Sequence, residues 1–142
     1  MAISLSTAQT LIDAAFAKGH ELDLKPLSVV VLDPRASMVA VMSQDGVSQM
    51  RAHIAHGKAN AAIAMGMGTR ALMNRAEQQA YFVQAINGLA DGDFVPVPGG
   101  VLITDKDGTL MGAVGISGDT SDNDEAAAVS GIQAAGLTAV TG

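Results

Sequence analysis

Two histidines and a lysine lie close together in one predicted helix, and their types and spacing are suited to chemistry. His53 and His56 are three residues apart, so they share a helix face, and Lys58 follows two residues later. A His-x-x-His pair can bind a metal ion, but no third ligand accompanies it, so we predict no metal site. Lys58 lies among alanines and a glycine, so it either extends to solvent or is reached by a ligand. His20 is at a helix end, where a solvated cap is common.

A glycine-rich stretch between Val97 and Glu125 is the second unusual feature. Glycine in a strand marks a bulge or a place where a ligand or another backbone comes close. Gly99 and Gly100 precede a predicted strand, where they either approach a ligand or form a tight turn that needs positive φ. Gly118 lies where a strand turns into the last predicted helix, and backbone N–H groups there can face an anion.

Acidic residues end this stretch, and we assign them different roles. We interpret Asp122 and Asp124 as residues that cap the last helix and complement its dipole. Glu125 occupies the position of a capping-box partner, and its role as a cap or as a proton carrier stays open.

Composition limits the classes of protein and of site. The 142 residues predict one domain over residues 1–142. The hydrophobic fraction of 49% exceeds what one small domain needs, which favours a homo-oligomer. A net charge of −6 without a basic patch argues against nucleic acid as a partner. The absence of cysteine excludes disulfides, thiolate metal sites and a cysteine nucleophile. It also fits a cytoplasmic protein, and we expect no membrane partner because no apolar run is long enough to span a bilayer.

The helices and strands that must position these residues are predicted to follow one another in the order α-β-β-α-α-β-β-α. A Ser6–Gln9 capping box opens the first helix, which Gly19 can close. Two hairpins and flanking helices favour an α/β (α+β) fold with a central antiparallel sheet. The predicted strands cover residues 27–32, 38–42, 101–104 and 110–116, and the later predicted helices cover 48–65, 71–86 and 123–137.

Six short motifs along nearly the whole chain resemble those of the GlcG/HbpS-like family of haem-binding or haem-degrading domains. The same domain occurs at the C-terminus of PduO-type adenosyltransferases. Ala36, Ser43 and Leu102 depart from the family's Gly, Arg and Pro, and the missing Arg removes a fixed cation. The matching residues are Asp33, Asp45-Gly46, Lys58-Ala59, Gly99-Gly100-Val101, the run from Gly112 to Gly118 that includes Ser117, and Asp124-Glu125.

The resemblance implies a profilin-like, three-layer α/β/α fold and a symmetric homo-oligomer, which is an octamer in several relatives. It also implies haem or another small molecule as the ligand. We expect the ligand site to combine the Gly99-Gly100 turn, the Gly118 loop and Lys58. The matched positions expected to bind the ligand are Gly99, Gly100, Val101, Ser117, Gly118, Asp33 and Asp45.

Three functions remain open. The first is a haem-binding accessory protein of a catabolic pathway, with His20, His53 or His56 as the iron ligand. The second is a lyase, isomerase or hydratase that acts on an organic acid. In that enzyme Lys58 would supply charge or act as the base, and Glu125 or His56 would carry a proton. The third is a non-catalytic oligomeric scaffold or sensor.

Overall fold

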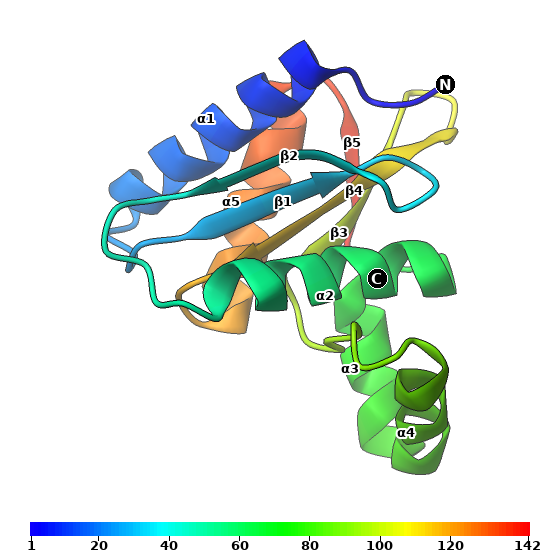
Figure 1. The fold of residues 1–142 in the computed structure, drawn as a ribbon. Helices are drawn as coiled ribbons and strands as arrows, with labels where there is room; N and C mark the ends of the chain where they lie inside the picture. Colours follow the sequence, from blue (N-terminus) through cyan, green and yellow to red (C-terminus); the bar gives the residue numbers. More distant parts are fainter.

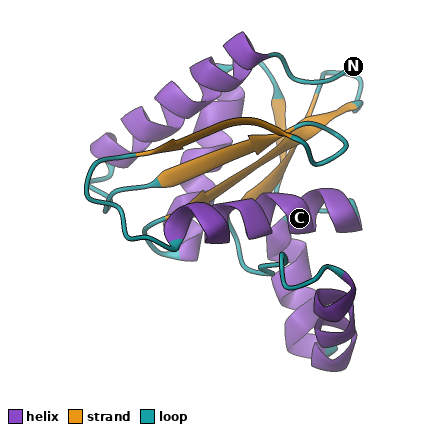
Figure 2. Ribbon diagram, viewed as in Figure 1, coloured by secondary structure: helices purple, strands orange, loops and turns teal.

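A five-stranded antiparallel sheet lies between two helical layers in the computed structural model, which describes residues 1–142 (Figures 1 and 2). Two helices, α1 (Leu5–Glu21) and α5 (Ser121–Ala134), cover one face, and α2 (Arg51–Met65) covers the other. The predicted three-layer α/β/α fold is therefore confirmed. The strands are β1 (Ser28–Leu32), β2 (Met38–Ser43), β3 (Gly100–Thr104), β4 (Leu110–Ser117) and β5 (Thr138–Val140), in the sheet order β2-β1-β4-β3-β5.

The continuous apolar sequence of β1 reflects burial on both of its faces. Successive side chains of a strand point to opposite sides of the sheet. Val29 and Val31 accordingly join the core formed with α1 and α5, whereas Val30 and Leu32 join the core under α2. A strand with one solvated face would have alternated apolar with polar residues.

Small residues bring α2 unusually close to the sheet. A Cβ atom on Gly115 of β4 would overlap the Ala55 carbonyl oxygen of α2. The helix side of the contact is equally small, because Ala55, Ala59 and Ala62 form that face. Gly115 therefore serves a close approach of two backbones, one of the readings left open by the sequence.

Two further helices, α3 (Thr69–Gln78) and α4 (Ala80–Leu89), project from the sheet as a separate lobe (Figure 1). The sequence predicted one helix over residues 71–86, but the chain breaks at Gln79, which has φ −139° and ψ 61°. Within the lobe α4 packs chiefly on α3. Two large apolar side chains of α4, Tyr81 and Leu89, remain 72% and 85% exposed.

The ends of α1 also differ from the prediction. Ser4 is the N-cap in place of Ser6, and its hydroxyl accepts a hydrogen bond from the Thr7 N–H at 3.2 Å. The helix then continues past Gly19 and ends at Glu21.

The last predicted helix is shorter than expected and has another cap. Thr120 is its N-cap instead of Asp122, and the Thr120 hydroxyl accepts the Asn123 N–H at 3.3 Å. The helix ends at Ala134, and residues 138–140 form the edge strand β5. None of the helices is both long and apolar enough to cross a membrane.

Candidate functional sites

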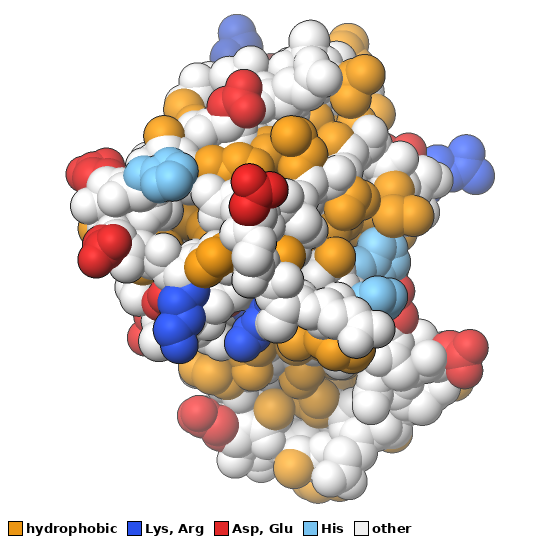
Figure 3. All heavy atoms as spheres, turned by 60° about the vertical axis from the view of Figure 1, so that its left-hand side comes forward, with side chains coloured by type: hydrophobic (Ala, Val, Ile, Leu, Met, Phe, Trp, Pro, Cys, Tyr) orange, Lys and Arg blue, Asp and Glu red, His pale blue; other side chains and the backbone are white.

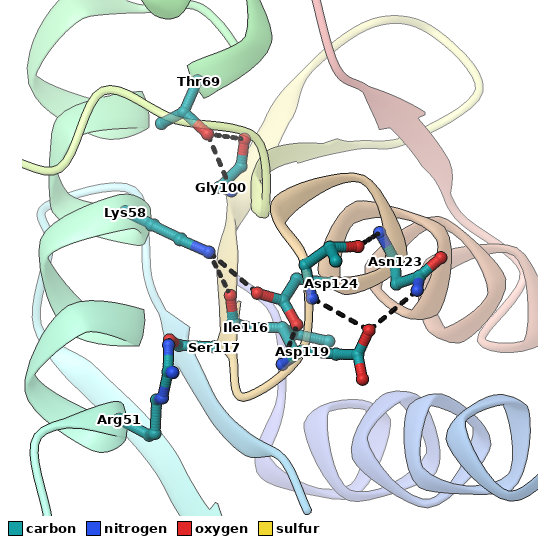
Figure 4. Close-up of polar contacts among 10 residues, drawn as sticks. Arg51, Lys58, Thr69, Gly100, Ile116, Ser117, Asp119, Asn123 and Asp124 are labelled. Atoms are coloured by element: carbon teal, nitrogen blue, oxygen red, sulfur yellow. Dashed lines mark hydrogen bonds and ion pairs between the residues drawn. The ribbon is translucent and has the colours of Figure 1, made fainter. Parts of the chain in front are cut away.

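The three segments expected to form the ligand site do meet, around a buried ion pair. Lys58 Nζ donates to Asp124 Oδ2 at 3.0 Å and to the Ile116 carbonyl oxygen at 2.9 Å (Figure 4). The Lys58 and Asp124 side chains are only 2% and 1% exposed. We call Lys58, Asp124 and the Ile116 carbonyl the lysine centre. It joins α2, β4 and α5.

The Gly99-Gly100 turn closes the lysine centre with the protein's own atoms. A Cβ on Gly99 would lie 2.8 Å from Lys58 Nζ, so the glycine makes room for the ammonium group. The Gly100 N–H donates to Thr69 Oγ1 at 2.8 Å, and the Thr69 hydroxyl donates to the Gly100 carbonyl at 3.1 Å (Figure 4). Thr69 therefore occupies the Gly100 backbone groups that the sequence suggested for a ligand.

Burial works against the charges of the lysine centre. It lowers the pKa of Lys58 and raises the pKa of Asp124, while the attraction and hydrogen bond between the two oppose both shifts. Asp124 Oδ1 also accepts the Asp119 N–H at 3.0 Å, so both carboxylate oxygens are paired. Neither Lys58 nor Asp124 lines a surface hollow. The arrangement fixes three elements together and offers no access to a substrate.

Glu125, the predicted proton carrier, is paired with a residue that the sequence analysis did not single out. Arg70 Nε lies 3.1 Å from both Glu125 carboxylate oxygens, and Arg70 Nη2 donates to Asp122 at 2.6 Å. Arg70 is the second residue of α3, so these ion pairs tie the start of α3 to the start of α5.

The remaining residues carried over from the family motifs lie apart from one another. Asp33 Oδ1 accepts the N–H groups of Arg35 and Ser37 and so shapes the turn between β1 and β2. Val101 is fully buried in the core. Asp45 and His20 line one hollow of about 430 Å³ near the end of α1.

His53 and His56 line two hollows together, which we call the histidine groove. One hollow, of about 320 Å³, is largely apolar, and the other, of about 460 Å³, lies between α2 and the segment after α4. Figure 3 shows pale-blue histidine side chains at the rim of a notch in this face. The groove exists because α2 covers little of β2. The apolar hollow is lined by Val30, Met38, Val41, Ala52, His53 and His56.

A carboxylate orients one of these histidines. His56 Nδ1 lies 2.9 Å from Asp93 Oδ2 and 3.0 Å from Asp93 Oδ1. Asp93 is itself held in place, because its carbonyl accepts the Asn60 side-chain amide at 2.9 Å. An ionised Asp93 makes Nδ1 the donor, which leaves Nε2 of a neutral His56 with its lone pair free. Histidines that bind metals are typically oriented by a carboxylate in this way.

Asp93 was missed because nothing local connects it with His56. The two residues are 37 positions apart and belong to a helix and a loop. The only nearby signal is the Asp91-Gly92 turn, in which both residues have positive φ and direct the chain back towards α2. Thr69 and Arg70 were missed for a similar reason, since their partners Gly100 and Glu125 are 31 and 55 positions away.

Known structures share this fold over nearly its whole length. The crystal structure of a PduOC:haem complex is 25% identical in sequence, with a TM-score of 0.86 over 96% of this chain and 97% of that chain. A double mutant of HbpS from Streptomyces reticuli is 23% identical, with a TM-score of 0.79 over 94% and 86% of the two chains. The Klebsiella pneumoniae protein ORFY is 21% identical, with a TM-score of 0.79 over 94% and 90%.

Sequence comparisons confirm the relationship that the motifs suggested. No curated protein sequence matches the chain. A family model described as haem-degrading protein HbpS-like matches residues 3–133, which is more than nine-tenths of the chain, and the chain therefore belongs to the HbpS-like haem-degrading protein family.

Proposed function

We propose that this protein binds haem in the histidine groove, with His56 as the iron ligand. The observation that carries the proposal is the pairing of His56 Nδ1 with Asp93 at the edge of an apolar hollow. This pairing orients the imidazole and leaves Nε2 for a metal ion. The PduOC:haem complex, which shares the fold at 25% identity, supports haem as the ligand.

The lining of the groove suits a flat apolar ligand. Val30, Met38 and Val41 come from the sheet and Ala52 from α2, so apolar atoms face the hollow from both sides. Haem binding requires such a surface together with an axial ligand, and haem iron then supplies electron-transfer or oxygen chemistry. In this proposal His56 holds the iron, and Asp93 accepts the Nδ1 proton and fixes the ring.

The contacts of the lysine centre weigh against the organic-acid enzyme in the form that the sequence suggested. That enzyme needs Lys58 and Glu125 free to act, whereas Lys58 is paired with Asp124 and Glu125 with Arg70. His56 is the one candidate of that set with a partly exposed side chain and an orienting carboxylate, which also suits a proton carrier.

Titration with hemin, followed by the Soret band, tests the proposal. We expect a saturable Soret shift for the wild-type protein and binding at least about tenfold weaker for His56→Ala. His20→Ala is the matched control, because His20 lines a different hollow and should leave the affinity unchanged. An absent wild-type shift, or a loss with His20→Ala but not with His56→Ala, would refute the proposal.

We also propose that the protein is a homo-oligomer. Edge strand β2 exposes Met38, Val41 and Met42, and α4 exposes Tyr81 and Leu89. Exposed apolar groups of this extent commonly mark interfaces between subunits. Light scattering at micromolar concentration should give a mass of at least twice the 14.3 kDa of one chain, and the mass of a monomer would overturn this proposal.

A further inference from the structure

A third hollow, of about 270 Å³, lies where α2 begins, and we call it the arginine hollow. Arg51 and Lys25 line it, together with the Gly46–Ser48 turn and Gly118, and no acidic side chain does. This is unexpected in a chain with 14 acidic and 8 basic residues. The hollow therefore concentrates positive charge on an otherwise acidic protein.

Arg51 has hydrogen-bond donors to spare in this hollow. Its side chain is half-buried, and its single hydrogen bond runs from Nη1 to the Ser117 hydroxyl at 3.2 Å (Figure 4). A guanidinium group carries five N–H donors, and Arg51 forms no ion pair. Arg70, by contrast, is neutralised by two carboxylates. Withdrawing Arg51 partly from water without a counter-charge is costly unless something else supplies that charge.

Two carboxylates close to the hollow, Asp119 and Asp124, are already engaged elsewhere, and Asp45, which precedes the Gly46–Ser48 turn, lines a different hollow. Asp119 accepts the backbone N–H groups of Lys25 and Thr120 at 3.0 and 2.9 Å and the Asn123 amide at 2.7 Å. Asp124 binds Lys58. The Arg51 charge also disfavours the charged form of Lys58, contributing to the lowered pKa of that group.

We propose that the arginine hollow binds a small oxyanion, a carboxylate or a phosphate, between Arg51 and Lys25. The planar guanidinium can contact two oxygens of such a group at once. The first turn of α2 adds favourable potential, because no side chain caps it. Pockets for drug-sized ligands usually occupy about 300–1,000 Å³, so the volume of this hollow suits a small anion.

This anion site is separate from the proposed haem site. None of the residues that line the arginine hollow lines the histidine groove. Anion binding should therefore persist in His56→Ala, whatever that variant does to hemin.

Calorimetric titration with inorganic phosphate and with malonate, at low ionic strength and with chloride as the blank, tests the proposal and separates the two kinds of anion. We expect wild-type protein to bind one or both, Arg51→Gln to bind at least about tenfold more weakly, and Lys25→Gln to lose several-fold. Arg35→Gln is the matched control, because it removes the same charge from an exposed turn that forms no ion pair.

Two results would overturn the site. One is the absence of saturable heat with both anions at about 10 mM, and the other is a loss with Arg35→Gln as large as that with Arg51→Gln. If Arg51→Gln does not fold, Arg51→Lys replaces it in the test. This variant keeps the positive charge but loses the planar guanidinium group that can contact two oxygens, so it should bind the anions more weakly than wild type. If Arg51→Lys and Lys25→Gln both bind the anions as tightly as the wild-type protein does, the proposal is rejected.

Discussion

The lysine centre and the histidine groove use the same components in opposite ways. Each pairs a basic side chain of α2 with a carboxylate from a distant segment: Lys58 with Asp124, and His56 with Asp93. The two basic residues are only two positions apart. Since successive residues of a helix are separated by about 100°, they point to nearly opposite sides. One side faces the sheet and the other faces the open edge beyond it.

Burial is what separates their chemistry. The Lys58 and Asp124 side chains are 2% and 1% exposed, whereas those of His56 and Asp93 are 28% and 39% exposed. A fully buried ion pair costs desolvation and often contributes little net stability, so its value lies in fixing geometry. A half-exposed pair keeps one nitrogen available to a ligand. Four variants test this distinction.

Breaking the lysine centre from one side should have the largest effect. Lys58→Met leaves the Asp124 carboxylate buried without a counter-charge, and we expect a loss of about 3–5 kcal/mol in the free energy of unfolding. The double variant Lys58→Met/Asp124→Leu should recover most of it. Urea denaturation measures both, and Lys18→Met, from an exposed pair, should cost less than about 1 kcal/mol. A double variant no more stable than the single one would contradict this account.

Adding a side chain to the Gly99-Gly100 turn beside the lysine centre should have the second-largest effect. A Cβ on Gly100 would overlap the Lys58 carbonyl oxygen, so Gly100→Ala should lower the free energy of unfolding by about 1–3 kcal/mol. Because Gly100 packs directly on α2, a side chain at this position costs stability first. Gly88→Ala in α4 is the control, because open space surrounds it, and it should gain up to about 1 kcal/mol. Equal thermal midpoints for the two variants would argue against close packing at Gly100.

Asp93→Asn tests the partly exposed pair of His56 and Asp93 in the histidine groove. Loss of the charge that orients His56 should weaken hemin binding by about 10–100-fold, the usual effect of removing such a partner, with little change in stability. Asp91→Asn removes a second carboxylate that lines the same hollow but whose side chain forms no hydrogen bond, so it is the control for the loss of charge alone. Lys58→Met should show the reverse pattern, with stability lost and hemin affinity kept in the folded fraction. If the hemin affinity falls equally for Asp91→Asn and Asp93→Asn, the claim that Asp93 orients the iron ligand is wrong.

The smallest expected effect concerns Asp119, a carboxylate near the lysine centre but close to solvent. Hydrogen bonds from Asn123 and from the Lys25 and Thr120 N–H groups lower its pKa below the usual 3.8. Its contribution to stability is therefore complete above that value and is lost as the pH falls through the lowered pKa. Asp119→Asn should be less stable than wild type near neutral pH, with the difference shrinking in acid. Urea midpoints across pH measure this, and a difference that grows in acid would contradict it.

The sequence predicted the layers of the fold better than it predicted the contacts. The apolar run at residues 27–32 and the end of the predicted helix over residues 48–65 rest on local signals, and both lie where expected. The break at Gln79 carries no glycine or proline, so nothing marked it. Strand β5 has only three residues, too few to show a period of two.

The candidate sites show the same limit. The family motifs brought Lys58 and Asp124 into one set, but spacing could not reveal that they bind each other across 66 positions. Helix periodicity did place His53 and His56 on a common side. It could not separate them from His20, because the hollows that distinguish the three arise only when β2 lies beside α2.

The projecting lobe has a consequence for how the molecule opens. Because α4 rests chiefly on α3 and buries only Val83, its backbone should exchange amide hydrogens through local unfolding, well before the sheet does. Asp93 lies in the segment that leaves this lobe. Because the Asn60 side chain of α2 holds the Asp93 carbonyl, the pairing of His56 with its carboxylate should persist through such openings, and the imidazole stays oriented while the amides of the lobe exchange.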